Sequence, residues 1–328
     1  MKYTALKAHL DAAKVGAAPF APCYIVYGDD AWLRQSAVSM FRALVEQEYA
    51  SFNFSLIPAS DGAGEAVFTL NTFPVFDERR VVVVRDVSEK LPAADIAAYE
   101  SYLGSPAAES VLVFECESGG EKSLPFKSAE RVDCNRLAEA EISLIVKGML
   151  DAEPRRTMRP DALHELVTRT LADMSRISCE VAKLKAYCDS EITREDVAVM
   201  TSAEPDLRIF QLSDAMGAKD HDRALKVLTA LLDDGLRPMT VINMLYGYYR
   251  RMLHVELHKD EPPEKVAALL GVKPGALYHV KKASSSYTQV KLKKCVDYLH
   301  SLQCAVLTGR RTEESAMHDA VLTLMSQV

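Results

Sequence analysis

The sequence has no apolar run long enough to cross a membrane. Its longest apolar stretch, residues 17–27, is interrupted by Pro19 and Pro22, whereas a membrane-spanning helix needs about 20 consecutive apolar residues. The first 14 residues are amphipathic and charged, and they lack the apolar segment of a signal peptide. These absences predict a cytoplasmic protein without a membrane partner.

Cysteine is scarce, and its spacing matches no disulfide or metal pattern. The seven cysteines are an odd number, and no two of them form a Cys-x-x-Cys pair. Cys179 and Cys188 are nine positions apart, as are Cys295 and Cys304. Nine residues turn a helix by about 900°, which places the members of each pair on opposite faces. We therefore expect buried free thiols in a reducing compartment.

The sequence also lacks the motifs of a catalytic or metal site. There is no Gly-x-Ser-x-Gly nucleophile motif. His254 and His258 would share one helix face, but the zinc-protease pattern has glutamate directly after the first histidine, and Glu256 stands one position later. Surface histidines are the favoured interpretation. We expect no metal, no cofactor and no enzymatic activity of the chain by itself.

The residues of a phosphate-binding loop are missing at the one strand-to-helix turn where such a loop would be expected. The apolar run 23–27 leads into Gly28, but the places of the second Gly, the Lys and the Ser or Thr of a P-loop hold Leu33, Arg34 and Gln35. Leucine gives no flexible nest of amides, and glutamine has no hydroxyl for magnesium. The two aspartates after Gly28 would repel phosphate. The pattern favours a structural strand-to-helix turn.

What the sequence does contain is an alternation of strand and helix patterns in its first part, which indicates a parallel sheet with crossover helices. After about residue 135 the strand signal disappears, and the pattern is helical. With 328 residues, two or three domains are expected. Strands are predicted at 23–27, 54–59, 80–87 and 110–117, and helices at 31–49 and 91–103.

Basic residues gather near the C-terminus. The formal net charge of −7 argues against a protein that is basic throughout, yet residues 271–328 hold eight lysines and arginines against four aspartates and glutamates. These lysines could contact nucleic-acid phosphates or line a solvated helix face, and the second explanation is the favoured one. The cluster consists of Lys281, Lys282, Lys291, Lys293 and Lys294.

Residues 72–80, TFPVFDERR, place apolar side chains directly before four charged ones. A short helix is expected over 65–72. Pro74 should stop it, because proline has no backbone N–H and restricts the residue before it. The charged residues 77–80 are expected to keep the neighbourhood hydrated.

Val75 and Phe76 are therefore expected on a turn with a fixed entry angle, whereas Phe73 is expected to turn inward. Phe76 either anchors the chain in a pocket of another protein or folds back into its own core. The residues alone leave both possibilities open.

Several stretches resemble one protein family in their order and spacing. They are 24–30 (YIVYGDD), 74–76 (PVF) with 79–84 (RRVVVV), 180–187 (EVAKLKAY), 209–215 (IFQLSDA) and 224–238. Together, over nearly the full length, they resemble the delta subunit of the bacterial DNA polymerase III clamp loader. The resemblance implies an AAA+/RecA-like parallel-sheet domain without a P-loop (1–140), a small helical lid (141–207) and a helical collar (208–328).

The resemblance also implies a function and partners. Delta subunits are similar to AAA+ ATPases but do not hydrolyse ATP. They bind the sliding clamp, the beta subunit, and open its ring or hold it open for loading on primed DNA during replication. The implied partners are this clamp, the gamma/tau and delta prime subunits joined through the collar, and primer-template DNA, all within the DNA polymerase III holoenzyme.

In this family the clamp-contacting turn corresponds to Pro74, Val75 and Phe76. The sequence departs from the commonest pattern, because Asn71 stands where some relatives have Gln and Val75 where many have Leu. Two alternatives stay open, a stand-alone DNA-binding protein that uses the C-terminal lysines and a degenerate AAA+ ATPase. Salt-dependent DNA binding and ATP binding by the isolated chain would distinguish them.

Overall fold

The computed structural model describes the chain except residues 88–90, 153–154, 203–204, 219, 271–276, 285–286 and 328. It divides into two compact units, Met1–Ser202 and Ala203–Val328. The three-part division with limits at 140 and 207 stays a prediction. No described helix combines the length and apolar character needed to cross a membrane.

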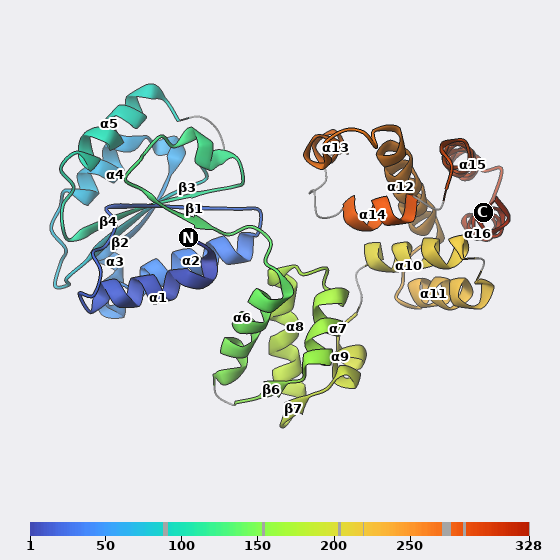
Figure 1. The fold of residues 1–328 in the computed structure, drawn as a ribbon, viewed down its shortest axis with the longest axis horizontal. Coiled ribbons are helices and arrows are strands. Elements are labelled where there is room, and N and C mark those ends of the chain that lie inside the picture. Colours follow the sequence, from blue (N-terminus) through green and yellow to red (C-terminus); the bar gives the residue numbers. More distant parts are fainter. Residues whose placement is uncertain are drawn as a thin grey trace. The chain divides into compact units, whose positions relative to one another are not determined.

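A five-stranded parallel sheet forms the centre of the first unit (Figure 1), with the strand order β2-β3-β4-β1-β5. β1 and β4 are buried almost throughout, as interior strands covered on both faces must be. The predicted α/β fold with a parallel sheet is therefore confirmed. The strands are β1 (Cys23–Tyr27), β2 (Phe54–Pro58), β3 (Arg80–Arg85), β4 (Ser110–Cys116) and β5 (Glu130–Asp133).

The four predicted strands are present, and β5 is an additional strand that the pattern did not reveal. β5 lies at the sheet edge, and only Val132 of its four residues is buried. An edge strand needs few apolar side chains, so the charged sequence of β5 carries little strand signal.

Helices cover both faces of the sheet (Figure 1), and the alternation of side chains along β3 explains why. Val81 packs in the cluster that contains α1 and α2, and the next residue, Val82, packs in the cluster that contains α4 and α5. The helices around the sheet are α1 (Tyr3–Lys14), α2 (Ala31–Arg42), α3 (Ala50–Asn53), α4 (Ala63–Leu70) and α5 (Ala93–Leu103).

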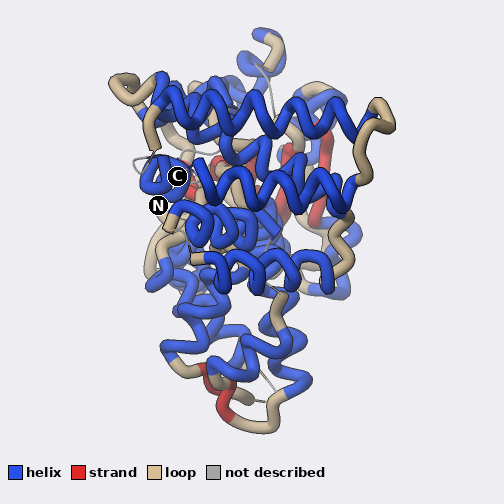
Figure 2. The backbone as a smooth tube through the Cα atoms, turned by 90° about the vertical axis from the view of Figure 1, so that its right-hand side faces the viewer, coloured by secondary structure: helices blue, strands red, loops and turns tan. Residues whose placement is uncertain are grey.

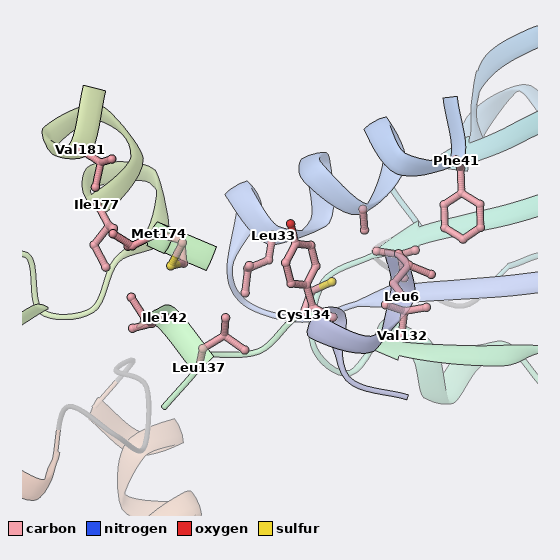
Figure 3. Close-up of a cluster of buried hydrophobic side chains, with 14 of the residues drawn as sticks. Leu6, Leu33, Phe41, Val132, Cys134, Leu137, Ile142, Met174, Ile177 and Val181 are labelled. Atoms are coloured by element: carbon pink, nitrogen blue, oxygen red, sulfur yellow. The ribbon is translucent and has the colours of Figure 1, made fainter. Parts of the chain in front are cut away.

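The first unit continues into four helices and a two-stranded parallel sheet. The expectation of helices alone after about residue 135 is therefore wrong for two short strands, each of only two residues and so too short for an alternating pattern. Figure 3 shows one buried apolar cluster running from Phe41 and Val132 past Leu33 to Ile142 and Met174, so sheet and helices share a core. These elements are α6 (Glu139–Asp151), β6 (Thr157–Met158), α7 (Pro160–Arg169), α8 (Met174–Tyr187), β7 (Glu191–Ile192) and α9 (Arg194–Met200).

The described residues of the second unit form helices and connecting loops (Figure 2). α12 is its central element, with Leu245, Tyr249 and Met252 fully buried. The Tyr249 and Tyr287 hydroxyls lie 3.2 Å apart, which satisfies both in the interior. The helices are α10 (Pro205–Gly217), α11 (His221–Asp233), α12 (Pro238–Leu257), α13 (Pro263–Leu270), α14 (Leu277–Ser284), α15 (Gln289–Leu307) and α16 (Glu313–Gln327).

The cysteines are all free thiols, but two of them are not buried. Cys188 and Cys295 are buried, whereas Cys179 and Cys304 are exposed. The expectation of buried thiols is wrong for the latter two. The nine-residue spacing places each on the helix face opposite its buried counterpart, so only one member of each pair can reach the core.

Candidate functional site

The candidate site is the turn between α4 and β3. α4 ends at Leu70, two residues earlier than expected. The Asn71 side chain donates to the Val67 carbonyl at 2.9 Å, and the Thr72 hydroxyl donates to the Phe68 carbonyl at 3.0 Å. The Thr72 hydroxyl satisfies a carbonyl that the helix end leaves open, and the Asn71 side chain is a second donor to the Val67 carbonyl, which also accepts from the Asn71 N–H at 3.1 Å.

Two aromatic rings of the turn face solvent. Phe76 is 81% exposed, and Phe73 is 77% exposed. The expectation that Phe73 turns inward is therefore wrong, because the inward space beneath it holds polar groups: its own carbonyl accepts a hydrogen bond from Arg80. Pro74 and Val75 are half-buried. Exposed neighbouring aromatics of this kind mark a binding surface more often than a core.

Asn53, the last residue of α3, holds the backbone of the turn. Its side chain is fully buried. Its Nδ2 donates to the Val75 carbonyl at 2.8 Å, and its Oδ1 accepts from the Val75 N–H at 2.8 Å. Both polar groups of Val75 are thus bound by one side-chain amide. The next residue, Phe76, has a positive φ of 55°, which is uncommon for a residue other than glycine.

Arg80 supports the same turn from the start of β3. It is 5% exposed, and the expectation that it belongs to a hydrated charged rim is wrong. Its guanidinium donates to the carbonyls of Phe52 at 2.8 Å and Phe73 at 3.0 Å. Burial lowers the pKa of Arg80. These carbonyls supply the acceptors that a buried cation requires.

The end of the turn is tied to two further segments. Asp77 accepts from the Glu46 N–H at 2.8 Å. Arg79 donates to the Ala108 carbonyl at 2.7 Å, and its guanidinium lies 4.6 Å from the centre of the Phe20 ring. A short loop with this many partners has little freedom to rearrange, so the backbone that carries the exposed rings is held in place.

The turn after β1 is occupied by the chain's own polar groups. Asp30 caps α2, its Oδ1 accepting from the Leu33 N–H at 3.0 Å. Arg34, at the place of a P-loop lysine, donates to the Gly28 carbonyl and lies 3.5 Å from Glu115. A carboxylate and an internal ion pair thus occupy the positions where a nucleotide phosphate would need free N–H groups and a free cation.

Comparison with known proteins decides the family. A model described as "DNA polymerase III, delta subunit" matches residues 24–132, and one described as "DNA polymerase III delta subunit, C-terminal domain" matches residues 206–324. The chain belongs to the DNA polymerase III delta subunit family. The first match contains the whole candidate turn, and the second lies within the second compact unit.

Individual relatives in this delta subunit family are distant in sequence. The DNA polymerase III subunit delta of Bacillus subtilis is 23% identical over 326 residues, covering 93% of each chain. A probable DNA polymerase III subunit delta of Aquifex aeolicus is 27% identical over 147 residues, 43% of this chain and 42% of that one. The solved Bacillus subtilis DNA clamp loader delta protein shares the fold, with a TM-score of 0.76 at 23% identity over 98% of this chain and 99% of that one.

The predicted basic cluster of this delta family member lies on two helices. Lys281 is exposed on α14, and Lys291, Lys293 and Lys294 are exposed in the first turns of α15. Within the described part of the chain, no acidic side chain forms an ion pair with these four. The side chain of Lys282 lies outside what the structure describes. A DNA contact through these lysines stays a prediction.

The rings of His254 and His258 stack in parallel with centres 6.3 Å apart. Burial, followed by the nearby Arg250 and His258, lowers the pKa of His254. Among the described residues, no group of three potential metal ligands gathers anywhere.

Sequence reasoning missed the residues that hold the candidate turn. Asn53 carried no signal, because it lies 22 positions from its partner Val75. Arg80 carried a signal that was misread: an arginine directly before four buried valines, the second of two in sequence, should have suggested a buried cation with carbonyl partners.

Proposed function

We propose that this chain is the delta subunit of a DNA polymerase III clamp loader and that it binds the sliding clamp through Pro74, Val75 and Phe76. In this role it opens one interface of the ring, or holds it open, for loading on primed DNA. The observation that supports this proposal is the exposure of Phe76, whose aromatic ring is 81% exposed on a turn with a fixed backbone. A large apolar side chain presented in this way is typical of an interface anchor.

Phe73 contributes a second exposed ring beside the proposed anchor. Because Val75 is smaller than the leucine of many relatives, the turn offers less apolar volume at that position. The exposed Phe73 ring adds apolar area next to it. The proposed contact with the clamp is therefore aromatic on both sides of Pro74 and Val75.

The gamma/tau and delta prime subunits are proposed to join the chain through its second unit, and ATP hydrolysis is proposed to belong to those subunits. The match of residues 206–324 to the C-terminal domain of the family supports this arrangement. The internal polar contacts at the turn after β1 support a subunit that hydrolyses no ATP.

The test of the proposed function is clamp binding by a Phe76→Ala variant. The substitution should weaken binding to the sliding clamp by about 2–4 kcal/mol, as hot-spot aromatics do. Because the ring is exposed, the thermal midpoint should stay close to that of the unchanged chain. Surface plasmon resonance and thermal unfolding measure the two quantities.

A suitable control for that variant is Leu144→Ala, which removes another apolar side chain, 66% exposed, from α6 of the same unit. It should leave clamp binding unchanged. If Phe76→Ala binds the clamp as tightly as the unchanged chain, the proposed function is wrong.

The exposed lysines are proposed to contact primer-template DNA inside the assembled loader. Replacing Lys291, Lys293 and Lys294 with alanine should weaken DNA binding by the complex. The slope of log affinity against log salt should fall by about 0.9 for each lost phosphate contact. Clamp binding should not change, and Lys226→Ala, an exposed lysine of α11, serves as the control. Tight, steeply salt-dependent DNA binding by the isolated chain would instead favour a stand-alone DNA-binding protein.

A further inference from the structure

Asn53 and Arg80 are polar side chains that are fully or almost fully buried. Both form hydrogen bonds with the backbone beneath the exposed rings. We propose that they are positioning residues, which hold the turn in its clamp-binding geometry before the clamp arrives. This inference rests on the proposed function. It concerns how the anchor is presented rather than which residue is the anchor.

The sheet brings the two residues together. β2 and β3 are parallel neighbours in which Phe54 pairs with Val81. Asn53 directly precedes Phe54, and Arg80 directly precedes Val81, so the two face each other at the same edge of the sheet. The Arg80 Nη2 lies 3.4 Å from the Asn53 Oδ1. The turn leaves α4 and returns into β3 over this pair, because Arg80 is itself the first residue of β3.

The orientation of the Asn53 amide follows from these contacts. Its oxygen faces the Arg80 guanidinium and the Val75 N–H, and both are donors. Its nitrogen faces the Val75 carbonyl, an acceptor. A flipped amide would place donor against donor, so the surroundings select one orientation. The peptide groups on both sides of Val75 are then fixed.

The conformation of Phe76 needs such support. A positive φ at a residue other than glycine is strained and persists where the surroundings hold it. The φ of Phe76 is 55°. Its ring is 81% exposed and lies beside the Tyr49 ring, with centres 5.8 Å apart, so packing of the ring gives only part of the support. The neighbouring Val75 backbone, bound by Asn53, is the restraint on its N-terminal side.

A buried arginine is costly unless its N–H groups find acceptors, because the cation loses its hydration. No carboxylate of the described residues pairs with Arg80, and its Nε has no hydrogen-bond partner there. Its two other nitrogens bind carbonyls of Phe52 and Phe73, one on each side of the gap between α3 and the turn. The guanidinium thus bridges the turn to its support.

A preorganised turn binds more tightly because less conformational freedom is lost on association. The test therefore separates clamp affinity from fold stability. Asn53→Asp has the same shape and keeps the acceptor for Arg80 and for the Val75 N–H, but it loses the donor to the Val75 carbonyl. We expect it to bind the sliding clamp roughly tenfold more weakly, because the freed Val75 peptide must be ordered on association. Its thermal midpoint should also fall, since the Val75 carbonyl is left unpaired in the folded chain, and the melt measures that loss separately. Asn53→Ala removes both bonds and should weaken binding further.

A double-mutant cycle with Phe76→Ala tests the mechanism itself. If Asn53 acts by presenting Phe76, then Asn53→Asp should change clamp affinity less than about twofold once the ring is gone. A merely structural Asn53 would give the same loss in both backgrounds, and that additive result would overturn the inference. Wild-type affinity of Asn53→Asp would overturn it as well. Normal clamp binding by Phe76→Ala alone would instead overturn the proposed function, a separate result of the same series.

Discussion

At the scale of single residues, neighbouring polar groups decide whether an aromatic ring of the turn is buried or exposed. Phe73 and Phe76 are three positions apart, and both are exposed because the space beneath the turn holds the buried groups of Asn53 and Arg80. Filling that space with a ring would leave the Val75 amide and the guanidinium unsatisfied, which costs more than the apolar area gained.

Gly28 is a second residue whose surroundings decide what can stand there, because they leave no room for a Cβ atom. Its φ is 151°, and a Cβ placed there would lie 2.2 Å from the Cys134 carbonyl carbon. Because Cys134 is held by a hydrogen bond from its N–H to the Tyr27 carbonyl at 2.7 Å, the backbone cannot easily move away. Gly28→Ala should therefore cost about 3 kcal/mol or more of unfolding free energy. Urea denaturation measures this loss.

Gly148 gives the matched control for that substitution. It lies inside α6, and a Cβ there would meet no atom within 4 Å. Gly148→Ala should raise stability by roughly 0.5–1 kcal/mol, the usual gain for alanine over glycine in a helix. Equal effects of the two substitutions would contradict the steric explanation for Gly28.

At the scale of elements, one carboxylate serves two helix starts. Asp30 accepts from the Leu33 N–H of α2 with one oxygen and from the Met174 N–H of α8, at 3.4 Å, with the other. Helix N-termini attract anions, so a carboxylate between two of them is favourable. A bound phosphate is another anion that a helix start of this kind can hold. At α2 the Asp30 carboxylate takes that position.

Asp30→Ala should therefore lower the free energy of unfolding of the first unit by about 2 kcal/mol, more than the loss of an ordinary helix cap. Asp173→Ala is the control, because Asp173 caps α8 alone through the Arg176 N–H at 2.9 Å, and it should cost about 1 kcal/mol. Chemical denaturation gives both values. Neither variant should bind labelled ATP in equilibrium dialysis, and saturable ATP binding by the unchanged chain would revive the degenerate-ATPase alternative.

At the scale of the whole molecule, each compact unit has its own core. The two clusters of the first unit draw on both faces of the sheet and on α6 to α9. The cluster of the second unit draws on α10 to α16. A core that is complete within one unit can support independent folding.

Residues 203–328 expressed alone should therefore give a helical fragment that unfolds cooperatively. Far-UV circular dichroism during heating would show a single sigmoidal transition. A matched fragment of residues 1–202 should behave in the same way. A non-cooperative melt of the C-terminal fragment would mean that its core is completed by the rest of the chain.

The sequence by itself determined the features that depend on neighbours along the chain. The buried strand runs, the unsuitable P-loop turn and the family resemblance are all local patterns. Their physical basis is side-chain periodicity and backbone chemistry, which a few consecutive residues specify. These patterns were enough to predict the parallel α/β fold and to single out Val75 and Phe76.

Only the tertiary structure decided which side chains of the turn are exposed and what holds them there. Asn53 and Arg80 meet because β2 and β3 pair in parallel in one register, a contact across 27 positions that no local pattern encodes. The edge strand β5 is recognised for the same reason, since its hydrogen-bond partner β1 lies far away in sequence. Burial depends on which segments come together, and that is a property of the fold.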